Sequence, residues 1–235
     1  MELYGHRGYS AKYPENTMAA FKAVLPYAQG IEFDVQLSRD DEIVIIHDET
    51  LDRTTSGKGL VKDEDYNSIN SLSIRGGDKD QYVPRLVDVL EWARGLEDFT
   101  LNIELKTDFI PYEGIAEKTY RLVEAYGLVN QTVFSSFNLQ TLEELREAAP
   151  DARIGILIHH SIPRLKQWVK ELDAEAIHCP PDFPFTEEAQ MLRLHGTKLR
   201  VYTVDDTETM KELDGKVDVI MTDDVETLRH AIERE

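Results

Sequence analysis

Residues 31–47, Ile-Glu-Phe-Asp-Val-Gln-Leu-Ser-Arg-Asp-Asp-Glu-Ile-Val-Ile-Ile-His, decide the fold of this chain. The stretch holds two β-type runs, Ile31–Val35 and Ile43–His47, joined only by the charge-rich residues 36–42. A crossover between parallel strands needs about a dozen residues or more, so the two runs must instead form an antiparallel hairpin. A turn near Asp40 then returns His47 to the side of Asp34, at one end of the sheet.

Outside this hairpin, short β-type runs alternate with segments of helical period along the chain, as expected of an α/β protein with a mainly parallel sheet. With the return strand of the hairpin set aside, eight strands remain, which is the number of a closed (β/α)8 barrel. The predicted barrel strands are Leu3–His6, Ile31–Val35, Leu101–Lys106, Thr132–Phe137, Arg153–Ile158, Ala176–Cys179, Leu199–Val204 and Val217–Thr222. Predicted helix starts are Asn16 or Thr17 before Met18–Ala28, Pro84 before Arg85–Arg94, Asn138, Thr186, Asp205 or Asp206, and Asp224.

The composition is that of a globular protein. The chain has 235 residues, 41% of them hydrophobic and 30% charged, and its 45 acidic and 26 basic residues give a net charge of −19. So acidic a chain is expected to avoid nucleic acid and stable membrane association, because both partners are polyanions. The single cysteine and the lack of an apolar run of about 18 residues favour a cytoplasmic protein.

Residues 51–82 interrupt the alternation of strands and helices. They are rich in Gly, Ser and Thr and carry little periodic apolar character, so we expect no core of their own. Insertions of this length in a compact domain are usually functional or disordered. We therefore predict one catalytic domain over residues 1–235, with residues 51–82 as an insertion over one end of the barrel, acting as a lid.

Charged side chains alternate with apolar ones on two strands. Glu32 and Asp34 share one face of the second strand, and Glu104 and Lys106 share one face of the next barrel strand. If the apolar faces pack against helices, these charges point into the barrel, where an isolated charge is costly unless it is paired or bound to a metal.

Two interpretations of this cluster are open. The first is a buried ion-pair network, in which Lys106 and Arg7 neutralise the carboxylates. The second assigns Glu32, Asp34 and Glu104 to one divalent cation, and the all-oxygen donor set favours Mg²⁺ or Ca²⁺ without deciding between them. We favour the metal site, because two cations cannot satisfy three carboxylates together with two histidines.

Two histidines and two cations lie near the predicted cation site. His6 ends the first strand and His47 ends the hairpin, so the pair can take and give a proton in acid/base catalysis. Arg7 and Lys106 are suited to the oxygens of a phosphate group. Such local positive charge would reverse the repulsion that the acidic surface exerts on an anionic substrate.

In order along the chain, the motifs resemble those of the glycerophosphodiester phosphodiesterases, a TIM-barrel family related to the bacterial phosphatidylinositol-specific phospholipases C. The matching pieces are His6-Arg7-Gly8, Pro14-Glu15-Asn16-Thr17, Glu32-Phe33-Asp34-Val35, His47 to Thr55, Pro84-Arg85-Leu86 and Glu104-Leu105-Lys106, with fainter similarity at Ser136-Phe137, Tyr202-Thr203-Val204 and Thr222-Asp223. Two departures from the pattern bear on the alcohol pocket: Tyr202 and Asp205 replace a common tryptophan and asparagine, and Asp224-Val225 replaces the usual end of the last strand.

The resemblance implies hydrolysis of a glycerophosphodiester to sn-glycerol 3-phosphate and an alcohol. It places a divalent cation on Glu32, Asp34 and Glu104, acid/base chemistry on His6 and His47, and phosphate contacts on Arg7 and Lys106, with Glu15, Asn16 and Tyr202 as supporting residues. By similarity to the phospholipases C, the glycerol 2-hydroxyl attacks phosphorus and water then opens the cyclic phosphate, while the histidines exchange roles.

Other functions remain open from the sequence. Lysophospholipase D activity would need an apolar lip at the barrel mouth, which Pro180 to Phe185 could supply, although a rigid loop explains that stretch equally well. A non-catalytic phosphoester-binding protein would keep the barrel without turnover, and a barrel enzyme that enolises a carbonyl compound would leave His6, Arg7 and the insertion without a role. The partner is expected to be a small molecule, and the sequence does not indicate an oligomeric state.

Overall fold

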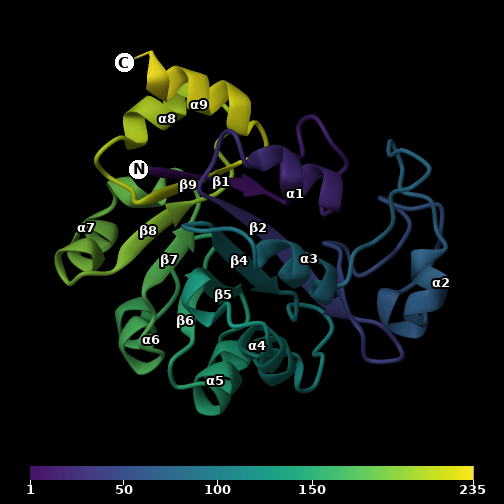
Figure 1. The fold of residues 1–235 in the computed structure, drawn as a ribbon. Coiled ribbons are helices and arrows are strands. Elements are labelled where there is room, and N and C mark those ends of the chain that lie inside the picture. Colours follow the sequence, from purple (N-terminus) through teal and green to yellow (C-terminus); the bar gives the residue numbers. More distant parts are fainter. Residues whose placement is uncertain (235) are drawn as a thin grey trace.

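Eight parallel strands close into a barrel in the computed structural model, which describes residues 1–234 (Figure 1). Strand β1 pairs with both β2 and β9, so the first and last strands of the chain close the cylinder. The barrel strands are β1 (Glu2–His6), β2 (Gly30–Leu37), β4 (Thr100–Leu105), β5 (Thr132–Ser136), β6 (Arg153–Leu157), β7 (Ala176–Cys179), β8 (Lys198–Val201) and β9 (Val219–Thr222). The predicted (β/α)8 TIM barrel is therefore confirmed.

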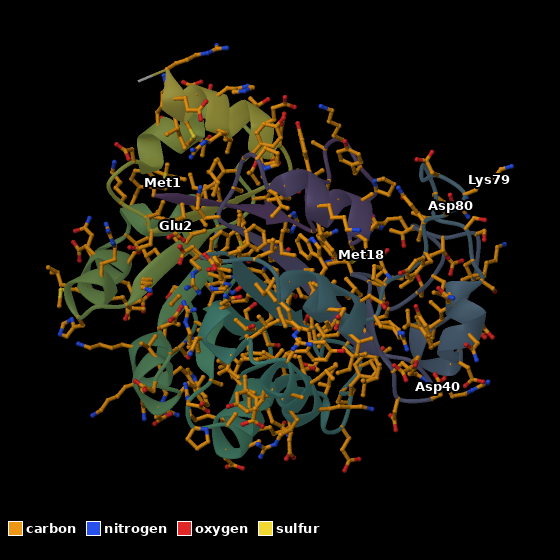
Figure 2. The ribbon with its side chains drawn as sticks, in the orientation of Figure 1. Met1, Glu2, Met18, Asp40, Lys79 and Asp80 are labelled. Atoms are coloured by element: carbon orange, nitrogen blue, oxygen red, sulfur yellow. The ribbon has the colours of Figure 1, made fainter. Side chains whose placement is uncertain are left out.

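The hairpin after the second barrel strand is also confirmed. Strand β3 (Ile43–Ile45) runs antiparallel to β2, with Val35 opposite Ile45. Asp40 lies in the connecting turn, at the edge of the molecule (Figure 2). Beyond the strand, the amide of Ile46 donates to the carbonyl of Asp34 over 3.2 Å, which brings His47 next to that strand.

Helices surround the barrel, and side-chain oxygens cap several of their N-termini. The α-helices are α1 (Met18–Val24), α2 (Tyr66–Asn70), α3 (Leu86–Ala93), α4 (Ile115–Ala125), α5 (Leu139–Ala148), α6 (Leu165–Glu171), α7 (Glu187–Leu194), α8 (Thr207–Leu213) and α9 (Val225–Glu233); the single 3-10 turns are η1 (Val61–Asp63), η2 (Val129–Gln131) and η3 (Phe183–Phe185). The capping residues are Thr17, Asn138, Thr186, Asp206 and Asp224.

Helix α1 is shorter than predicted. It ends at Val24 rather than Ala28, because Pro26 has no amide hydrogen to donate to the helix. Thr17 caps this helix. Asn16 has a left-handed backbone, with φ of 56°, and its side chain bonds to Asp34 instead.

The apolar faces of the strands pack against the helices, as the alternation in the second strand predicts. Ile31, Phe33 and Val35 are fully buried in the main hydrophobic cluster between the sheet and the helices. The residues between them therefore face the barrel interior. That interior is polar for much of its length, because Glu32, Asn102 and Arg200 lie in it beneath the carboxyl ends of the strands.

The side chain of Arg200 crosses the barrel interior near the amino ends of the strands. Arg200 is 1% exposed, donates to Nε2 of His178 over 3.1 Å and pairs with Glu175. Burial, followed by the charge of Arg200, lowers the pKa of His178 well below its ordinary value. The ring of His178 fits because residue 155 is glycine: a side-chain carbon there would overlap the imidazole.

The insertion, residues 51–82, lies beside the barrel and beyond α1 and α3 (Figure 1), with Lys79 and Asp80 at its outer end (Figure 2). The expectation that it has no core was wrong. Its sparse apolar residues bury a small cluster by using the outer face of the hairpin, a partner that sequence periodicity does not reveal. The cluster contains Val44, Ile46, Leu51, Val61, Tyr66, Ile69, Ile74 and Val83. Within residues 1–234, no helix combines the length and the apolar character that a bilayer crossing requires.

Candidate active site

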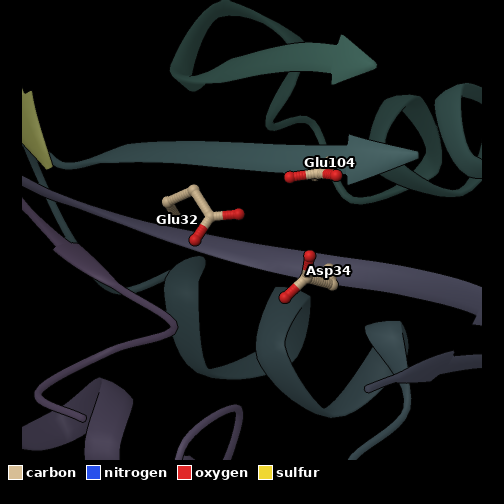
Figure 3. A group of neighbouring side chains, drawn as sticks. All are labelled: Glu32, Asp34 and Glu104. Atoms are coloured by element: carbon tan, nitrogen blue, oxygen red, sulfur yellow. The ribbon is translucent and has the colours of Figure 1, made fainter. Parts of the chain in front are cut away.

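Three carboxylates converge at the carboxyl ends of neighbouring barrel strands (Figure 3). Glu32 and Asp34 lie on β2 and Glu104 on β4, and the strand register places Glu104 opposite Asp34. One oxygen of each carboxylate lies within 4.8 Å of the others, and all three residues are buried. Alternation along β2 and parallel pairing with β4 thus bring together the residues that the sequence predicts as cation ligands.

The proximity of the carboxylates changes how readily they ionise. Burial, and then the charges of Asp34 and Glu104, raise the pKa of Glu32. Burial and the charge of Asp34 raise the pKa of Glu104 to about 7. Burial would also raise the pKa of Asp34, but nearby positive charge, that of Arg7 first, holds it below its usual value. In the absence of a cation, ionisation of all three carboxylates together is therefore unfavourable.

The ion pairs of the alternative interpretation exist, but they leave part of the cluster unpaired. Lys106 Nζ lies 3.1 Å from Glu104 Oε1, and Arg7 Nε lies 3.6 Å from Asp34 Oδ2. Glu32 accepts a hydrogen bond from the amide of Arg7 at Oε2, while its buried Oε1 has no hydrogen-bond partner. Two cations thus do not satisfy three carboxylates.

The residues present fit a divalent cation. Asn16 Nδ2 donates to Asp34 Oδ2 over 2.9 Å, and the Oδ1 of Asn16 is, like Oε1 of Glu32, buried without a partner. Unpaired buried oxygens beside three carboxylates form a donor set that suits a hard cation such as Mg²⁺ or Ca²⁺. Asn16, predicted as a supporting residue, thus contacts Asp34 and does not cap α1.

His6 lies at the end of β1 and is held by a residue from the far end of the chain. Its Nδ1 lies 2.7 Å from Asp223 Oδ1, and its Nε2 lies 3.9 Å from Glu32 Oε2. The hydroxyl of Ser10 donates to the same Asp223 oxygen, and the amide of Asp223 donates to Asp205 Oδ1. His6 is therefore fixed through Nδ1, with Nε2 on the side of the carboxylate cluster.

His47 is held in a matching way from the hairpin. Its Nδ1 lies 2.8 Å from Asp48 Oδ1, and its Nε2 lies 3.5 Å from Lys106 Nζ. Arg53 of the insertion donates hydrogen bonds to both oxygens of Asp48, from Nε over 2.7 Å and from Nη2 over 2.9 Å. Hydrogen bonds from Arg53 lower the pKa of Asp48.

The same arginine links Arg7 to the insertion through Glu15. Arg53 donates to both oxygens of Glu15, at 2.6 and 2.8 Å, and Glu15 Oε1 accepts from Arg7 Nη1 over 3.0 Å. Glu15, predicted as a supporting residue, thus orients Arg7. The carboxylate–guanidinium chain runs continuously from Asp48 to Arg7.

A cavity of about 570 Å³ opens above this cluster. Its charged side comes from β1, β2, β4 and the hairpin, and its other side is aromatic and apolar. The lining residues are His6, Arg7, Glu32, His47, Asn102, Glu104, Lys106, Asp108, Phe109, Phe137, Leu157, His159, Tyr202, Thr203 and Met221. None of residues 180–185 is among them in the described chain, so the lip considered from the sequence is not there.

A larger groove of about 960 Å³ lies elsewhere, at the amino ends of β6, β7 and β8. Its polar groups are largely engaged: Arg146 donates to a series of backbone carbonyls, and Arg153 pairs with Glu175. It contains none of the predicted site residues. Sites in parallel barrels form at the carboxyl ends of the strands, so the smaller cavity is the candidate.

The structure thus brings all the predicted site residues to one edge of the barrel. Tyr202 lies in the cavity wall, where its hydroxyl donates to the carbonyl of Ile158 over 2.8 Å. Asp48, Arg53 and Asp223 hold the histidines and lie within stretches that match the family motifs, but they were not predicted as site residues. Asp48 directly follows His47, whereas the contacts of Arg53 with Glu15 and of Asp223 with His6 form only in the fold.

Comparison with known proteins assigns the chain to a family. Residues 6–227 match the model of the glycerophosphoryl diester phosphodiesterase family. A glycerophosphodiester phosphodiesterase of Caldanaerobacter subterraneus subsp. tengcongensis is 39% identical, covering 99% of this chain and 98% of that protein. One of Bacillus altitudinis is 33% identical, covering 94% of each.

Solved structures of phosphodiesterases have the same fold as this chain. The crystal structure of a glycerophosphodiester phosphodiesterase from Agrobacterium tumefaciens superposes with a TM-score of 0.85 at 31% identity, over 98% of this chain and 99% of that one. A phosphodiesterase of Oleispira antarctica, solved with the product sn-glycerol-3-phosphate, has a TM-score of 0.85 at 26% identity, over 99% and 97%. The chain therefore belongs to the glycerophosphodiester phosphodiesterase family and is an enzyme of that class.

Proposed function

We propose that this phosphodiesterase releases sn-glycerol 3-phosphate from glycerophosphodiesters in a metal-dependent reaction, with His6 and His47 exchanging protons. The proposal rests on one observation: the two imidazoles have the same kind of hydrogen-bond partner and line the same cavity. Each has Nδ1 on an aspartate, at 2.7 and 2.8 Å, and each lines the same cavity beside the buried carboxylates. The product bound in the Oleispira antarctica relative is consistent with this reaction.

Glu32, Asp34 and Glu104 would hold one Mg²⁺ or Ca²⁺. When bound, such a cation lowers the pKa of a hydroxyl and offsets charge that grows on phosphoryl oxygens. Asn16 orients Asp34 by its hydrogen bond, and Arg7 orients Glu32 through its backbone amide. Both contacts fix the orientation of the carboxylates.

Arg7 and Lys106 would bind the non-bridging oxygens of the phosphate. Both line the cavity, and Glu15 holds the Arg7 guanidinium by a hydrogen bond of 3.0 Å. Burial would lower the pKa of Lys106, but the charges of Glu104 and Asp34 raise it, so the ammonium stays protonated. A permanent positive charge here stabilises the transition state of phosphoryl transfer.

The proton transfers follow from the histidine pair. One histidine accepts the proton of the glycerol 2-hydroxyl as its oxygen bonds to phosphorus, and the other donates a proton to the departing alcohol oxygen. Water then adds to the cyclic phosphate with the two roles exchanged, which restores both imidazoles. Either histidine can act first in this scheme, because both have the same aspartate contact.

The test is a coupled assay for sn-glycerol 3-phosphate on a small panel of glycerophosphodiesters, with Mg²⁺, Ca²⁺ or EDTA. We expect product in the presence of a cation and none with EDTA. Glu32→Ala should abolish turnover and leave a folded protein, as judged by circular dichroism. Turnover near that of the wild type in Glu32→Ala, or full activity in EDTA, would refute the assignment of the cation ligands.

Two other functions are outcomes of the same assay. Comparable rates on glycerophosphocholine and its lysolipid counterpart would indicate lysophospholipase D activity, and absence of any turnover would indicate a phosphoester-binding protein. We further infer that the chain acts as a single catalytic domain on a small-molecule substrate, with residues 51–82 as its insertion. Support for this comes from Arg53, which ties the insertion to Asp48 and Glu15.

A further inference from the structure

A buried glutamine continues the polar face of β2 beyond the carboxylates. Gln36 follows Glu32 and Asp34 at the same period-two spacing and is fully buried. The pairing of β2 with β4 ends at Val35, and Gln36 lies opposite Val44 of the hairpin strand β3. A buried side-chain amide needs partners for its oxygen and its nitrogen. The partners of Gln36 show what this residue does.

The nitrogen of the Gln36 amide is bound to the segment that carries His47. Nε2 donates to the carbonyl oxygens of Ile46, His47 and Asp48 over 3.0, 3.0 and 2.8 Å. Its two hydrogens are therefore shared among three acceptors. Strand β3 ends at Ile45, so its regular pairing with β2 stops before these residues. One side chain thus holds the backbone of His47 where the strand no longer does.

Tyr112 fixes the orientation of this amide. It lies in the loop between β4 and α4, and its hydroxyl donates to Gln36 Oε1 over 2.9 Å. Backbone carbonyls only accept hydrogen bonds, so Nε2 must face them and Oε1 must face the phenol. Burial raises the pKa of Tyr112, which keeps its hydroxyl protonated as the donor. The loop after β4 and the end of the hairpin are thereby joined through Gln36.

The side chains of His47 and Asp48 are held by other contacts. Asp48 Oδ1 lies next to Nδ1 of the imidazole, and Arg53 binds both oxygens of Asp48. These contacts set the direction of the ring, whereas Gln36 sets the backbone position from which the ring extends. A displacement of about 1 Å in a catalytic group can lower a rate by about 10².

We propose that Gln36, fixed by Tyr112, is a positioning residue that holds His47 where proton transfer requires it. The inference rests on the proposed function, because it acts through the acid/base role of His47. The lining of the cavity includes His47 but neither Gln36 nor Tyr112. Loss of these contacts should therefore lower kcat and leave KM, which depends on the phosphate contacts of Arg7 and Lys106, almost unchanged.

The test measures kcat and KM for glycerophosphocholine, at a saturating concentration of Mg²⁺ or Ca²⁺, in Gln36→Met and Tyr112→Phe. Methionine keeps the length of the side chain but cannot donate, and phenylalanine keeps the ring but lacks the hydroxyl. We expect kcat to fall about ten- to hundredfold in Gln36→Met and about three- to tenfold in Tyr112→Phe, with KM changed by less than about twofold. If Gln36→Met does not fold, Tyr112→Phe carries the test.

Gln131→Met and Tyr120→Phe are the matched controls. Gln131 Nε2 donates to the carbonyl of Leu96 over 3.3 Å, and the Tyr120 hydroxyl donates to Asp151 Oδ1 over 2.6 Å. Neither Gln131 nor Tyr120 lines the cavity, so kcat should stay within about twofold of the wild type. Losses in the controls as large as those in the test variants would indicate general loosening and would overturn the proposal.

Combined substitutions test whether the effect passes through His47. In a His47→Ala background, assayed at high enzyme concentration, Gln36→Met or Tyr112→Phe should lower the residual kcat by less than about twofold, because groups that act as a unit do not have additive effects. The full loss in that background, or a wild-type kcat in the folded single variants, would overturn the proposal.

Failure of the proposed function gives a different result, namely that the wild type itself does not turn over any glycerophosphodiester of the panel. Hydrogen exchange of the Ile46 amide, which donates to the carbonyl of Asp34, then measures the hold of Gln36 on this segment. Exchange at least about tenfold faster in Gln36→Met, or in Tyr112→Phe if the former does not fold, would support that hold. Equal exchange rates would overturn it.

Discussion

Asp223 holds His6 through Nδ1, and we predict that catalysis depends on this contact. Asp223→Asn keeps the size of the side chain but can present an amide hydrogen to the imidazole, which favours the wrong tautomer. We expect kcat to fall by roughly 10² to 10⁴, as when the aspartate of a catalytic triad is replaced. Ser10→Ala is the control: it removes one hydrogen bond to Asp223 but keeps the carboxylate, so less than a tenfold loss is expected. Equal, small losses in both variants would show that Asp223 does not set the tautomer.

The carboxylate cluster leads to a prediction about pH. A cation needs ionised ligands, and in the absence of a cation the pKa of Glu104 is raised to about 7 and that of Glu32 is raised as well. Below pH 7 protons therefore compete with the cation. We expect the Kd for Mg²⁺ or Ca²⁺ to rise at least about tenfold for each pH unit below 7.

Calorimetric titration between pH 5.5 and 8.5 measures this dependence. Thermal stabilisation by a fixed concentration of the cation should shrink over the same range, because the stabilisation depends on the ratio of concentration to Kd. A Kd that stays constant from pH 6 to 8 would contradict the assignment of Glu104 as a ligand.

At the scale of the element, the insertion affects the site through Arg53, which contacts both Asp48 and Glu15 in two-pronged fashion. Lysine cannot reproduce this geometry. We predict that Arg53→Lys lowers kcat/KM by at least tenfold. Arg39→Lys is the matched control, because Arg39 makes a similar two-pronged pair with Asp65 far from the cavity. It should leave kcat/KM within twofold, and similar losses in both variants would indicate a general loosening of the insertion.

The elements differ in how far the sequence predicts them. The short connection of residues 36–42 is enough to predict the hairpin, and period-two alternation is enough to predict that Glu32 and Asp34 point inward. The core of the insertion is not predictable in this way, because part of it comes from the hairpin face that carries Val44 and Ile46. Arg53 was missed for the same reason: its partner Glu15 is distant in sequence and becomes a neighbour only in the fold.

At the scale of the whole molecule, closure of the barrel assembles the site. β1 pairs with β9, so His6 from the first strand meets Asp223 just after the last. No spacing in the sequence connects these residues, although each could be placed at a strand end. The eight-strand count predicts the closure, while the choice of Asp223 over Asp205 or Asp224 depends on side-chain geometry that only the closed barrel defines.

The polar interior of the closed barrel makes stability depend on pH. His178 accepts a hydrogen bond from Arg200 and its pKa is well below the usual value, so it stays neutral in the folded protein. In the unfolded chain it gains a proton below about pH 6.5, which favours unfolding as the pH falls. Between pH 6.5 and 5 the free energy of unfolding should therefore drop by about 2 kcal/mol more in the wild type than in His178→Gln, at about 1.4 kcal/mol per pH unit.

Glutamine at position 178 can still accept a hydrogen bond from Arg200 but does not titrate. His195→Gln, which replaces an exposed histidine, is the control and should keep the pH dependence of the wild type. Urea unfolding across this range measures the difference, and parallel curves for the wild type and His178→Gln would show that the imidazole is protonated in the folded barrel.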